Sequence, residues 1–259
     1  MTQESKFSFP TETVKLPSQG LVYSKDNPLS SGEVEIKYMT AKEEDILTSR
    51  NLIQKGIVID KLLESLIVTP IDYTELLIGD KNAIVYASRV LAYGKDYKVE
   101  IECPTCNKKS ENNIDLSLLE HKTIDFNKFN KGSDETEFIL PQSKIKTTLK
   151  LLRSKDEKVI DETLKGMKKI TAQTGTSFEM TTRLKHIITS INGVRDREKI
   201  NKFVSEELLA RDSLEIRSFM KSITPDLDTT FYFTCTDCGF EKELDIPLNV
   251  EFFWPRGSR

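Results

Sequence analysis

Apolar and polar residues alternate along several short stretches of this chain, and stretches with helical spacing separate them. Successive side chains of a strand point to opposite faces, so alternation predicts a strand with one buried face. The strands predicted in this way, with the return strands that would close two hairpins, are 34–38, 97–102, 113–116, 147–152, 230–234 and 241–246. Helical spacing predicts helices near 40–55, 58–67, 80–92, 178–191, 196–210 and 213–223, and one that begins at Ser154.

Polar residues suited to helix ends flank several of these stretches. Thr40 with Glu43, and Ser154 with Glu157, have the spacing of a capping box, in which two side chains bind the free N–H groups of a first helical turn. Asp80 is expected to cap the helix that follows it, because aspartate accepts hydrogen bonds well at that position. The residues expected to end helices are Gly56, Gly94 and Pro225.

Residues 1–33 have a different character from the rest of the chain. They contain several residues that favour turns, namely Pro10, Pro17, Gly20, Pro28 and Gly32. These residues predict an extended arm with turns rather than a packed helix. Such an arm would be suited to ordering on a partner protein.

The order of predicted elements occurs twice along the chain. A shift of 132 positions places the second Cys-x-x-Cys pair on the first, together with the strands that flank it. Upstream, a shift of 113 positions places residues 148–160 on residues 35–47. Because the upstream shift is the smaller one, an insertion is predicted in the middle of the second half. We therefore expect a mostly helical α+β fold of two duplicated lobes, whose hairpins meet at a split zinc ribbon.

The expected organisation follows from this repeat. It comprises an N-terminal arm at 1–33, a first repeat at 34–120, a linker at 121–144, a second repeat at 145–255 and a tail at 256–259. Each repeat would supply one Cys-x-x-Cys turn to the shared site.

Composition narrows the class of protein. The chain has 259 residues, of which 37% are hydrophobic and 31% charged, and a formal net charge of −3, which together predict a soluble globular protein rather than a general nucleic-acid binder. No stretch approaches the roughly 18 consecutive apolar residues of a membrane-spanning helix. The N-terminus has no basic stretch followed by an apolar one, so we expect no signal peptide and a reducing compartment. A local basic group at Lys165, Lys168 and Lys169 is interpreted as a solvated helix face.

Two Cys-x-x-Cys pairs carry the strongest chemical signal in the sequence. Cys103 with Cys106, and Cys235 with Cys238, lie at the tips of the two predicted hairpins. Tetrahedral zinc takes four thiolates readily, and the two-residue spacer lets both sulfurs of a turn face one ion. These four cysteines are therefore predicted to hold one structural Zn²⁺, although the two pairs lie far apart in the sequence.

Three other interpretations of the cysteines stay open. A catalytic zinc would keep an open coordination position and usually include histidine or carboxylate, but His121 and His186 have no ligand-like spacing. A redox pair would normally open a helix after a strand, and neither pair precedes a predicted helix. Two disulfides, or four thiols without a metal, complete the alternatives.

Motifs of common enzymes are absent from the sequence. There is no phosphate-binding GxxxxGK[ST], no GxGxxG, no GxSxG and no HExxH, so no catalytic residue is predicted. His186 lies among apolar residues of a predicted helix and is interpreted as a structural histidine. The aromatic run that ends at Trp254 is expected either to pack on the core or to present an interface.

Eight short motifs of the chain belong together. They are residues 16–23 (LPSQGLVY), 28–33 (PLSSGE), 37–47 (KYMTAKEEDIL), 61–67 (KLLESLI), 77–83 (LIGDKNA), 93–97 (YGKDY), 103–106 (CPTC) and 224–228 (TPDLD). In combination they resemble the T-even-type phage baseplate hub proteins and hub assembly proteins. The resemblance is dense over residues 16–106 and looser over 145–255.

The resemblance implies a non-enzymatic protein of contractile-tailed phages that acts in assembly of the central hub of the baseplate, as a hub component or an assembly chaperone. Its partners would be other hub or wedge proteins, and its location the host cytoplasm during assembly and the virion tail. The alternative is a zinc-ribbon protein that binds nucleic acid or regulates transcription. Acidic residues of the hairpins, such as Glu100, Glu102 and Glu243, disfavour contact with phosphates.

Overall fold

The computed structural model describes residues 10–247 and 250–253. Its strands are β1 (Thr11–Lys15), β2 (Glu33–Lys37), β3 (Asp96–Glu102), β4 (Lys109–Asp115), β5 (Glu135–Ile139), β6 (Lys146–Lys150), β7 (Ile188–Ile191), β8 (Thr230–Thr234) and β9 (Glu241–Asp245). Its α-helices are α1 (Ala41–Thr48), α2 (Arg50–Lys55), α3 (Val58–Leu66), α4 (Ile78–Tyr93), α5 (Ser154–Thr174), α6 (Glu179–Ile187), α7 (Arg197–Lys202) and α8 (Ala210–Ile223). Short 3₁₀ turns cover Pro28–Ser31, Tyr73–Glu75, Leu116–Leu118, Phe126–Lys128 and Val250–Phe253, and a π turn covers Phe203–Glu207.

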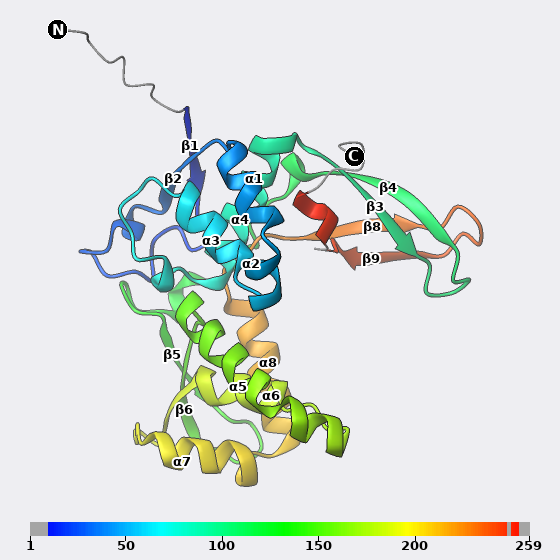
Figure 1. The fold of residues 1–259 in the computed structure, drawn as a ribbon. Coiled ribbons are helices and arrows are strands. Elements are labelled where there is room, and N and C mark those ends of the chain that lie inside the picture. Colours follow the sequence, from blue (N-terminus) through cyan, green and yellow to red (C-terminus); the bar gives the residue numbers. More distant parts are fainter. Residues whose placement is uncertain (1–9, 248–249, 254–259) are drawn as a thin grey trace, which may run out of the picture.

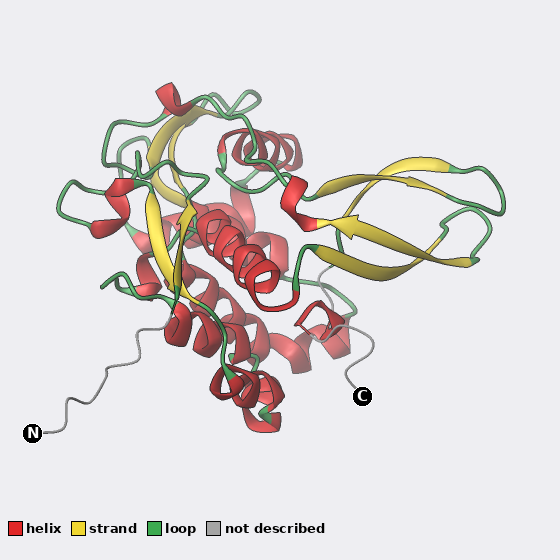
Figure 2. Ribbon diagram, turned by 90° about the horizontal axis from the view of Figure 1, so that it is seen from above, coloured by secondary structure: helices red, strands yellow, loops and turns green. Residues whose placement is uncertain are grey.

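Helices and small antiparallel sheets share this fold, in agreement with the predicted α+β class. Figure 1 shows β1, β2 and α1–α4 in one body, and β5–β7 with α5–α7 in a second body below it. Helix α8 runs between them, and buried apolar residues of both halves join one hydrophobic core. The hairpins β3–β4 and β8–β9 project side by side from the same flank of the molecule (Figure 2).

The N-terminal segment, predicted as an extended arm with turns, is a strand followed by turns that packs into the core over the residues described. Strand β1 pairs antiparallel with β2, with Val14 opposite Val34. Leu16, Tyr23 and Leu29 in the following turns are each no more than 2% exposed. The turn residues let the chain fold back on itself, and the apolar side chains between them supply the burial that holds it there.

Asp80 has a different role from the one predicted. Helix α4 begins at Ile78, so Asp80 lies within its first turn and is fully buried. Its carboxylate accepts the backbone N–H of Ser18 at 2.9 Å and the hydroxyl of Tyr23 at 2.6 Å. Burial raises the pKa of Asp80. The residue therefore ties the N-terminal segment to α4 instead of capping the helix.

The predicted helix at 40–55 is broken in two. Ser49 has extended backbone angles between α1 and α2, and serine favours the N-cap position that it occupies before α2. Gly56 ends α2 with φ of 70°, as predicted. The helix predicted at 58–67 is confirmed as α3.

The second half departs from the prediction at three places. The helix predicted at 178–191 ends at Ile187, because residues 188–191 form β7 and pair with β6. The helix predicted at 196–210 is α7 followed by the π turn, and α8 begins at Ala210. Within the segment predicted as a linker, 121–144, strand β5 pairs with β6 and so belongs to the second body.

The starts of α1 and α5 carry the same arrangement of hydrogen bonds. Glu43 accepts the backbone N–H of Thr40 at 2.9 Å and the ammonium of Lys37 at 2.8 Å. At α5, Asp156 accepts the backbone N–H of Arg153 at 3.0 Å and the ammonium of Lys150 at 2.6 Å. The box at Thr40 and Glu43 was predicted. The one at α5 begins one residue before Ser154 and uses Asp156 rather than Glu157.

The Glu43 cap predicts a pH-dependent stability. Burial alone would raise the pKa of Glu43, but hydrogen bonds from Lys37, Thr40 and Ser65 outweigh it and lower the pKa to about 2, from a usual 4.5. Its stabilisation is therefore complete above pH 4.5 and disappears as the pH falls towards 2. We expect Glu43→Gln to lower the free energy of unfolding by about 2 kcal/mol at neutral pH.

Urea unfolding of both proteins across this pH range would measure the difference, which should shrink as the pH falls. Asp45→Asn, an exposed carboxylate on the same helix, serves as the control and should have little effect. A pH-independent difference between Glu43→Gln and the wild type would contradict the assignment.

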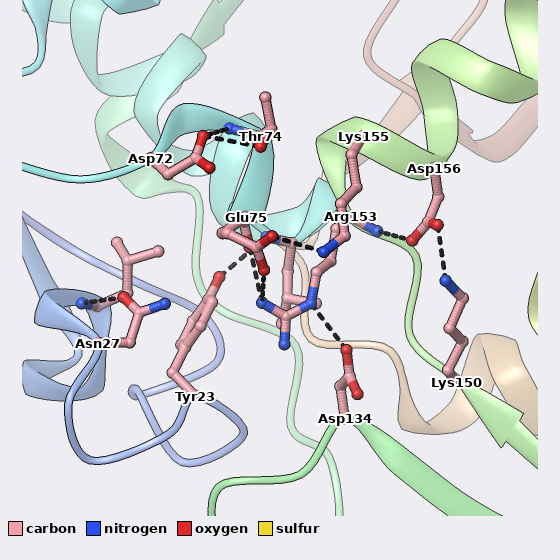
Figure 3. A network of polar contacts seen from close by, with 12 residues as sticks. Tyr23, Asn27, Asp72, Thr74, Glu75, Asp134, Lys150, Arg153, Lys155 and Asp156 are labelled. Carbon is pink, nitrogen blue, oxygen red and sulfur yellow. Dashed lines mark hydrogen bonds and ion pairs between the residues drawn. The ribbon is translucent and has the colours of Figure 1, made fainter.

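Arg153 joins the two bodies through a network of charges (Figure 3). Its guanidinium binds Asp134 at 2.8 Å and Glu75 at 2.9 Å, and it lies over the ring of Tyr23. Its side chain is only 13% exposed. Lys155 adds a second cation beside Glu75. The start of α5 is thereby fixed to the turn that precedes α4.

We expect Arg153→Met to lower the free energy of unfolding by about 3 kcal/mol, because it leaves the partly buried Asp134 without its cation and Glu75 with Lys155 alone. Arg195→Met is the matched control. Arg195 also binds a carboxylate, Glu135, but is 61% exposed, so its loss should amount to about 0.5 kcal/mol. Denaturant titrations of the two variants would show this contrast, and equal losses would argue against the network.

Candidate metal centre

Two hairpins bring the Cys-x-x-Cys pairs to their tips. In β3, Tyr97, Val99 and Ile101 are buried while the residues between them are exposed, which is the alternation that the sequence predicted. Strand β4 returns along β3, with Glu102 opposite Lys109. Strands β8 and β9 form the second hairpin in the same way, with Thr234 opposite Glu241. Each hairpin therefore ends in a turn that contains its two cysteines.

The two turns have matching backbone geometry. The N–H of Cys103 donates to Lys108 O at 2.9 Å, and the N–H of Asn107 donates to Cys103 O at 2.9 Å. In the second turn, the N–H of Cys235 donates to Phe240 O at 2.8 Å and that of Gly239 to Cys235 O at 3.0 Å. Asn107 and Gly239 have φ of 57° and 69°, the left-handed conformation that glycine adopts freely and asparagine tolerates better than most other residues.

The four sulfurs converge although the pairs are far apart in sequence. Cys103 Sγ lies 3.7 Å from Cys238 Sγ, and Cys106 Sγ lies 3.7 Å from Cys235 Sγ. All four sulfurs are within 4.8 Å of one another. Sulfurs bound to one tetrahedral zinc at about 2.3 Å lie about 3.8 Å apart. The four cysteines could therefore bind a metal ion with little rearrangement.

Disulfides do not form in this arrangement, in which all four cysteines are free. The separation of 3.7 Å is far longer than the roughly 2.05 Å of a disulfide bond. Each pair is followed by a return strand, so neither opens a helix as a redox pair would. Of the residues described, no histidine or carboxylate joins this group of thiols.

The thiols of this cluster differ in their affinity for protons. Burial raises the pKa of Cys103, but the backbone N–H groups of Cys106 and Thr105 outweigh it and lower the pKa to about 7. The backbone N–H of Phe240 lowers the pKa of Cys238, yet partial desolvation and hydrogen bonds with the three neighbouring thiols raise it to about 12, although the side chain is exposed. Several thiolates cannot gather here without a compensating charge, which a bound cation would supply.

The surroundings of the thiols are acidic and partly open to solvent. Cys103 and Cys235 are buried, Cys106 is half-buried and Cys238 is exposed. Lys108 of one turn binds Asp237 of the other at 2.6 Å, a link that the sequence did not predict. Acidic side chains outnumber basic ones along both hairpins. This surface would repel phosphates, which weighs against nucleic-acid binding.

The two histidines lie apart from the cysteines. His121 forms an isolated bridge with Leu227, and His186 lies near the end of α6. Burial lowers the pKa of both. Neither belongs to the group of thiols.

Comparison with known protein families assigns the chain to one of them. The model of the T4 bacteriophage base plate protein family matches residues 10–254. The chain belongs to this family. No curated protein and no solved structure matches it. The resemblance of the N-terminal motifs to baseplate proteins is thus confirmed, and it extends over nearly the whole chain.

Membership of this family implies that the protein interacts with other components of the phage baseplate. No helix in the described part of the chain has the length and apolar character needed to cross a membrane. None of the described contacts defines a catalytic constellation.

Proposed function

We propose that this baseplate protein acts in assembly of the central hub, as a hub component or an assembly chaperone, through protein–protein contacts. The family match supports a structural or assembly role in the baseplate. The convergence of four thiols at the tips of two projecting hairpins supports a site that shapes a surface rather than one that performs chemistry. We therefore propose a non-enzymatic role.

The metal that we propose for the four cysteines is a structural Zn²⁺. Four sulfur ligands at tetrahedral spacing are typical of closed zinc sites, which leave no position for a substrate. In the described part of the chain the two hairpins share no strand pairing, since each forms its own two-stranded sheet. Zinc would hold them in one orientation and prepare them for docking.

We further propose that the two halves are duplicated repeats. Strands β1 and β2 pair with Thr11 opposite Lys37, and β5 and β6 pair with Glu135 opposite Lys150. These pairs correspond when β1 is shifted by 124 positions and β2 by 113. The capping arrangements at α1 and α5 correspond at the same shift of 113.

Later elements support the same correspondence. Helices α3 and α6 match at a shift of 121, and α4 and α8 begin at positions 132 apart. The buried Asp212 of α8 accepts the N–H of Gln142 at 2.7 Å, as Asp80 of α4 accepts that of Ser18. Because the shift grows in two steps, the insertion predicted in the second half would divide between the longer helix α5 and the segment around α7.

This correspondence includes β1 and β5. The repeats that we propose therefore begin earlier than residues 34 and 145, the boundaries expected from the sequence. The turn-rich N-terminal segment and the segment 121–144 each contribute a first strand to their own repeat.

The hairpin pair is the contact surface that we propose for other hub or wedge proteins. It projects from the body, and Tyr232 on β8 is 63% exposed among acidic residues. An aromatic ring surrounded by carboxylates suits a partner with a basic surface. Assembly would take place in the host cytoplasm, with the protein either released or kept in the virion tail.

A complementation experiment tests the role. A phage of this family that lacks the gene would be supplied with the wild-type protein or with Tyr232→Ala, and tail intermediates would be separated by sedimentation. We expect the deletion to stop the pathway before a complete hub and the variant to restore fewer complete baseplates. Normal hubs without the protein would refute the hub role.

A further inference from the structure

Strand β1 has one edge that its partner β2 leaves open. Just beyond the strand, the N–H of Leu16 donates to Gly32 O at 2.8 Å. Bonded pairs alternate along an antiparallel ladder, so the bonds between β1 and β2 involve the even-numbered residues of β1. The backbone groups of Thr11, Thr13 and Lys15 therefore point away from β2. In the described part of the chain, no strand pairs with that edge.

A groove follows this open edge. It has a volume of about 290 Å³ and is lined by residues 12–15 of β1, by residues of α4 and by residues between 116 and 121. Thr13 and Val14 point to opposite faces of the strand, yet both line the groove, and no described residue of β2 does. The groove therefore adjoins the edge that β2 leaves open. An extended segment in it would reach the free backbone groups of β1.

The lining of the groove is mostly apolar and only partly covered. Ala87, Val90 and Leu91 of α4 are half-buried, as is Leu119. The adjacent Leu118 is 75% exposed. A cavity of about 150 Å³ holds a benzene ring, so this groove has room for an aromatic side chain. Removing these apolar groups from water would stabilise such an occupant.

Elsewhere on α4, the chain supplies its own aromatic cover. The ring of Phe252 meets Tyr86 edge to face, with centroids 5.1 Å apart, and the Nε of Arg89 donates to Phe252 O. Phe252 is 2% exposed, so part of the aromatic run noted in the sequence packs on the core, whereas Trp254 lies outside the described residues. Ala87, on the groove, has no such cover from the described residues.

The second half fills the corresponding place. On the repeat correspondence proposed above, Val14 of β1 matches Phe138 of β5, and Ala87 of α4 matches Phe219 of α8. The rings of Phe138 and Phe219 stack with their centroids 4.5 Å apart. Two phenylalanines thus pack in the second half where a valine and an alanine line an open groove in the first. The groove is therefore suited to an aromatic group that another chain supplies.

Opposite charges lie at two positions of β1 along the groove. Glu12 and Lys15 both line it, and both side chains are exposed. Opposite charges on facing positions of neighbouring strands attract each other. An added strand with a carboxylate beside Lys15 and a cation beside Glu12 would complement both charges.

We propose that an extended segment of another baseplate protein adds a strand to the open edge of β1. Hydrogen bonds to the backbone of Thr13 and Lys15 would hold it, and the groove would select an aromatic or large aliphatic side chain. A second copy of β1 fits less well, because its single apolar residue is Val14. The kind of partner rests on the proposed function in baseplate assembly.

Photo-crosslinking with the purified hub and wedge proteins of the same phage tests the proposal. The full-length protein would carry p-benzoylphenylalanine at the position of Thr13, whose exposed side chain lies on the groove. The matched control carries it at Glu137, the corresponding position of β5. We expect one partner to be crosslinked through one extended segment, with a yield several-fold higher from Thr13. Equal yields, no crosslink, or crosslinks between two copies of this chain would overturn the proposal.

Two substitutions then separate the backbone contact from the groove, with a synthetic peptide of the crosslinked segment as the probe. Thr13→Pro removes an N–H that β2 does not use, and proline is tolerated at such an edge. Ala87→Phe fills the groove as Phe219 does in the second half. Each should raise the dissociation constant at least several-fold while the circular dichroism stays native, and Thr13→Ala, which keeps the N–H, should not.

If Ala87→Phe fails to fold, Thr13→Pro decides. Peptide binding that no folded variant weakens would refute the proposal. The complementation experiment keeps this inference apart from the role in the hub. Hub assembly that needs the protein, without a crosslink from Thr13, would remove the groove proposal and leave the role in place.

Discussion

Cys235→Ser should reduce bound zinc from about one ion per chain to nearly none and lower the free energy of unfolding by several kcal/mol. The structural reason is the separation of the ligands. Cys235 reaches the sulfurs of the first hairpin only through the fold, so losing it releases two hairpins at once. Binding of a structural zinc contributes on the order of 10 kcal/mol to folded zinc-finger peptides. Metal analysis of the purified protein and thermal unfolding would measure both effects.

Thr236→Ser in the same turn is the matched control, because it changes an exposed side chain that offers no sulfur. It should keep the metal and the stability of the wild type. About two zinc ions per chain in the wild type would mean that the pairs bind separately. No metal in the wild type would remove the zinc site and leave the family membership untouched. Retention of the full metal content by Cys235→Ser would show that this cysteine is not a ligand.

Gly79→Ala should lower the free energy of unfolding by about 3 kcal/mol or more. A β-carbon at this position would lie 1.8 Å from the carbonyl oxygen of Pro225, which is backbone and cannot turn away as a side chain could. The start of α4 and the segment after α8 would have to separate. Overpacking of this kind typically costs about 1–3 kcal/mol, and a backbone clash lies at the upper end.

Hydrogen bonds of the neighbouring Asp226 reinforce the contact between Gly79 and Pro225. Asn82 on α4 donates to Asp226 at 3.1 Å, and Lys122 N–H donates to Asp226 O at 2.9 Å. Separation at Gly79 would loosen these bonds too. Denaturant titration followed by circular dichroism would give the loss of stability.

Gly166→Ala should instead raise the free energy of unfolding in the same experiment. Gly166 lies within α5, and a β-carbon there would meet nothing within 4 Å. Alanine should therefore stabilise the helix by about 0.5–1 kcal/mol. Equal effects of the two substitutions would mean that the close approach to Pro225 does not govern the stability of the interface.

Local features of the fold were predictable from the sequence because they depend on residues within one turn of one another. The capping box of Thr40 and Glu43, the left-handed positions Asn107 and Gly239, and the alternating strand β3 are of this kind. The family resemblance was also present in local motifs. Their evidence is short-range, so no knowledge of distant contacts was needed.

Predictions failed where a distant contact overrode a local preference. Aspartate is a residue type that favours helix caps, yet Asp80 is buried. Its carboxylate accepts hydrogen bonds from Tyr23 and Ser18, which lie about sixty positions away in sequence. Residues 188–191 have helical spacing but pair with β6 as a strand. In each case hydrogen bonds from another part of the chain gave the segment its final structure.

The sequence by itself determined which residues could hold a metal and that two hairpins would present them. The tertiary structure decided that the four sulfurs meet within 4.8 Å, that the N-terminal segment enters the core, and that Arg153 and Gly79 hold the halves together. The physical reason is that hydrophobic periodicity and capping preferences act over a few residues. The approach of Cys103 to Cys238, or of Gly79 to Pro225, depends on how whole elements pack, and packing is a property of the complete chain.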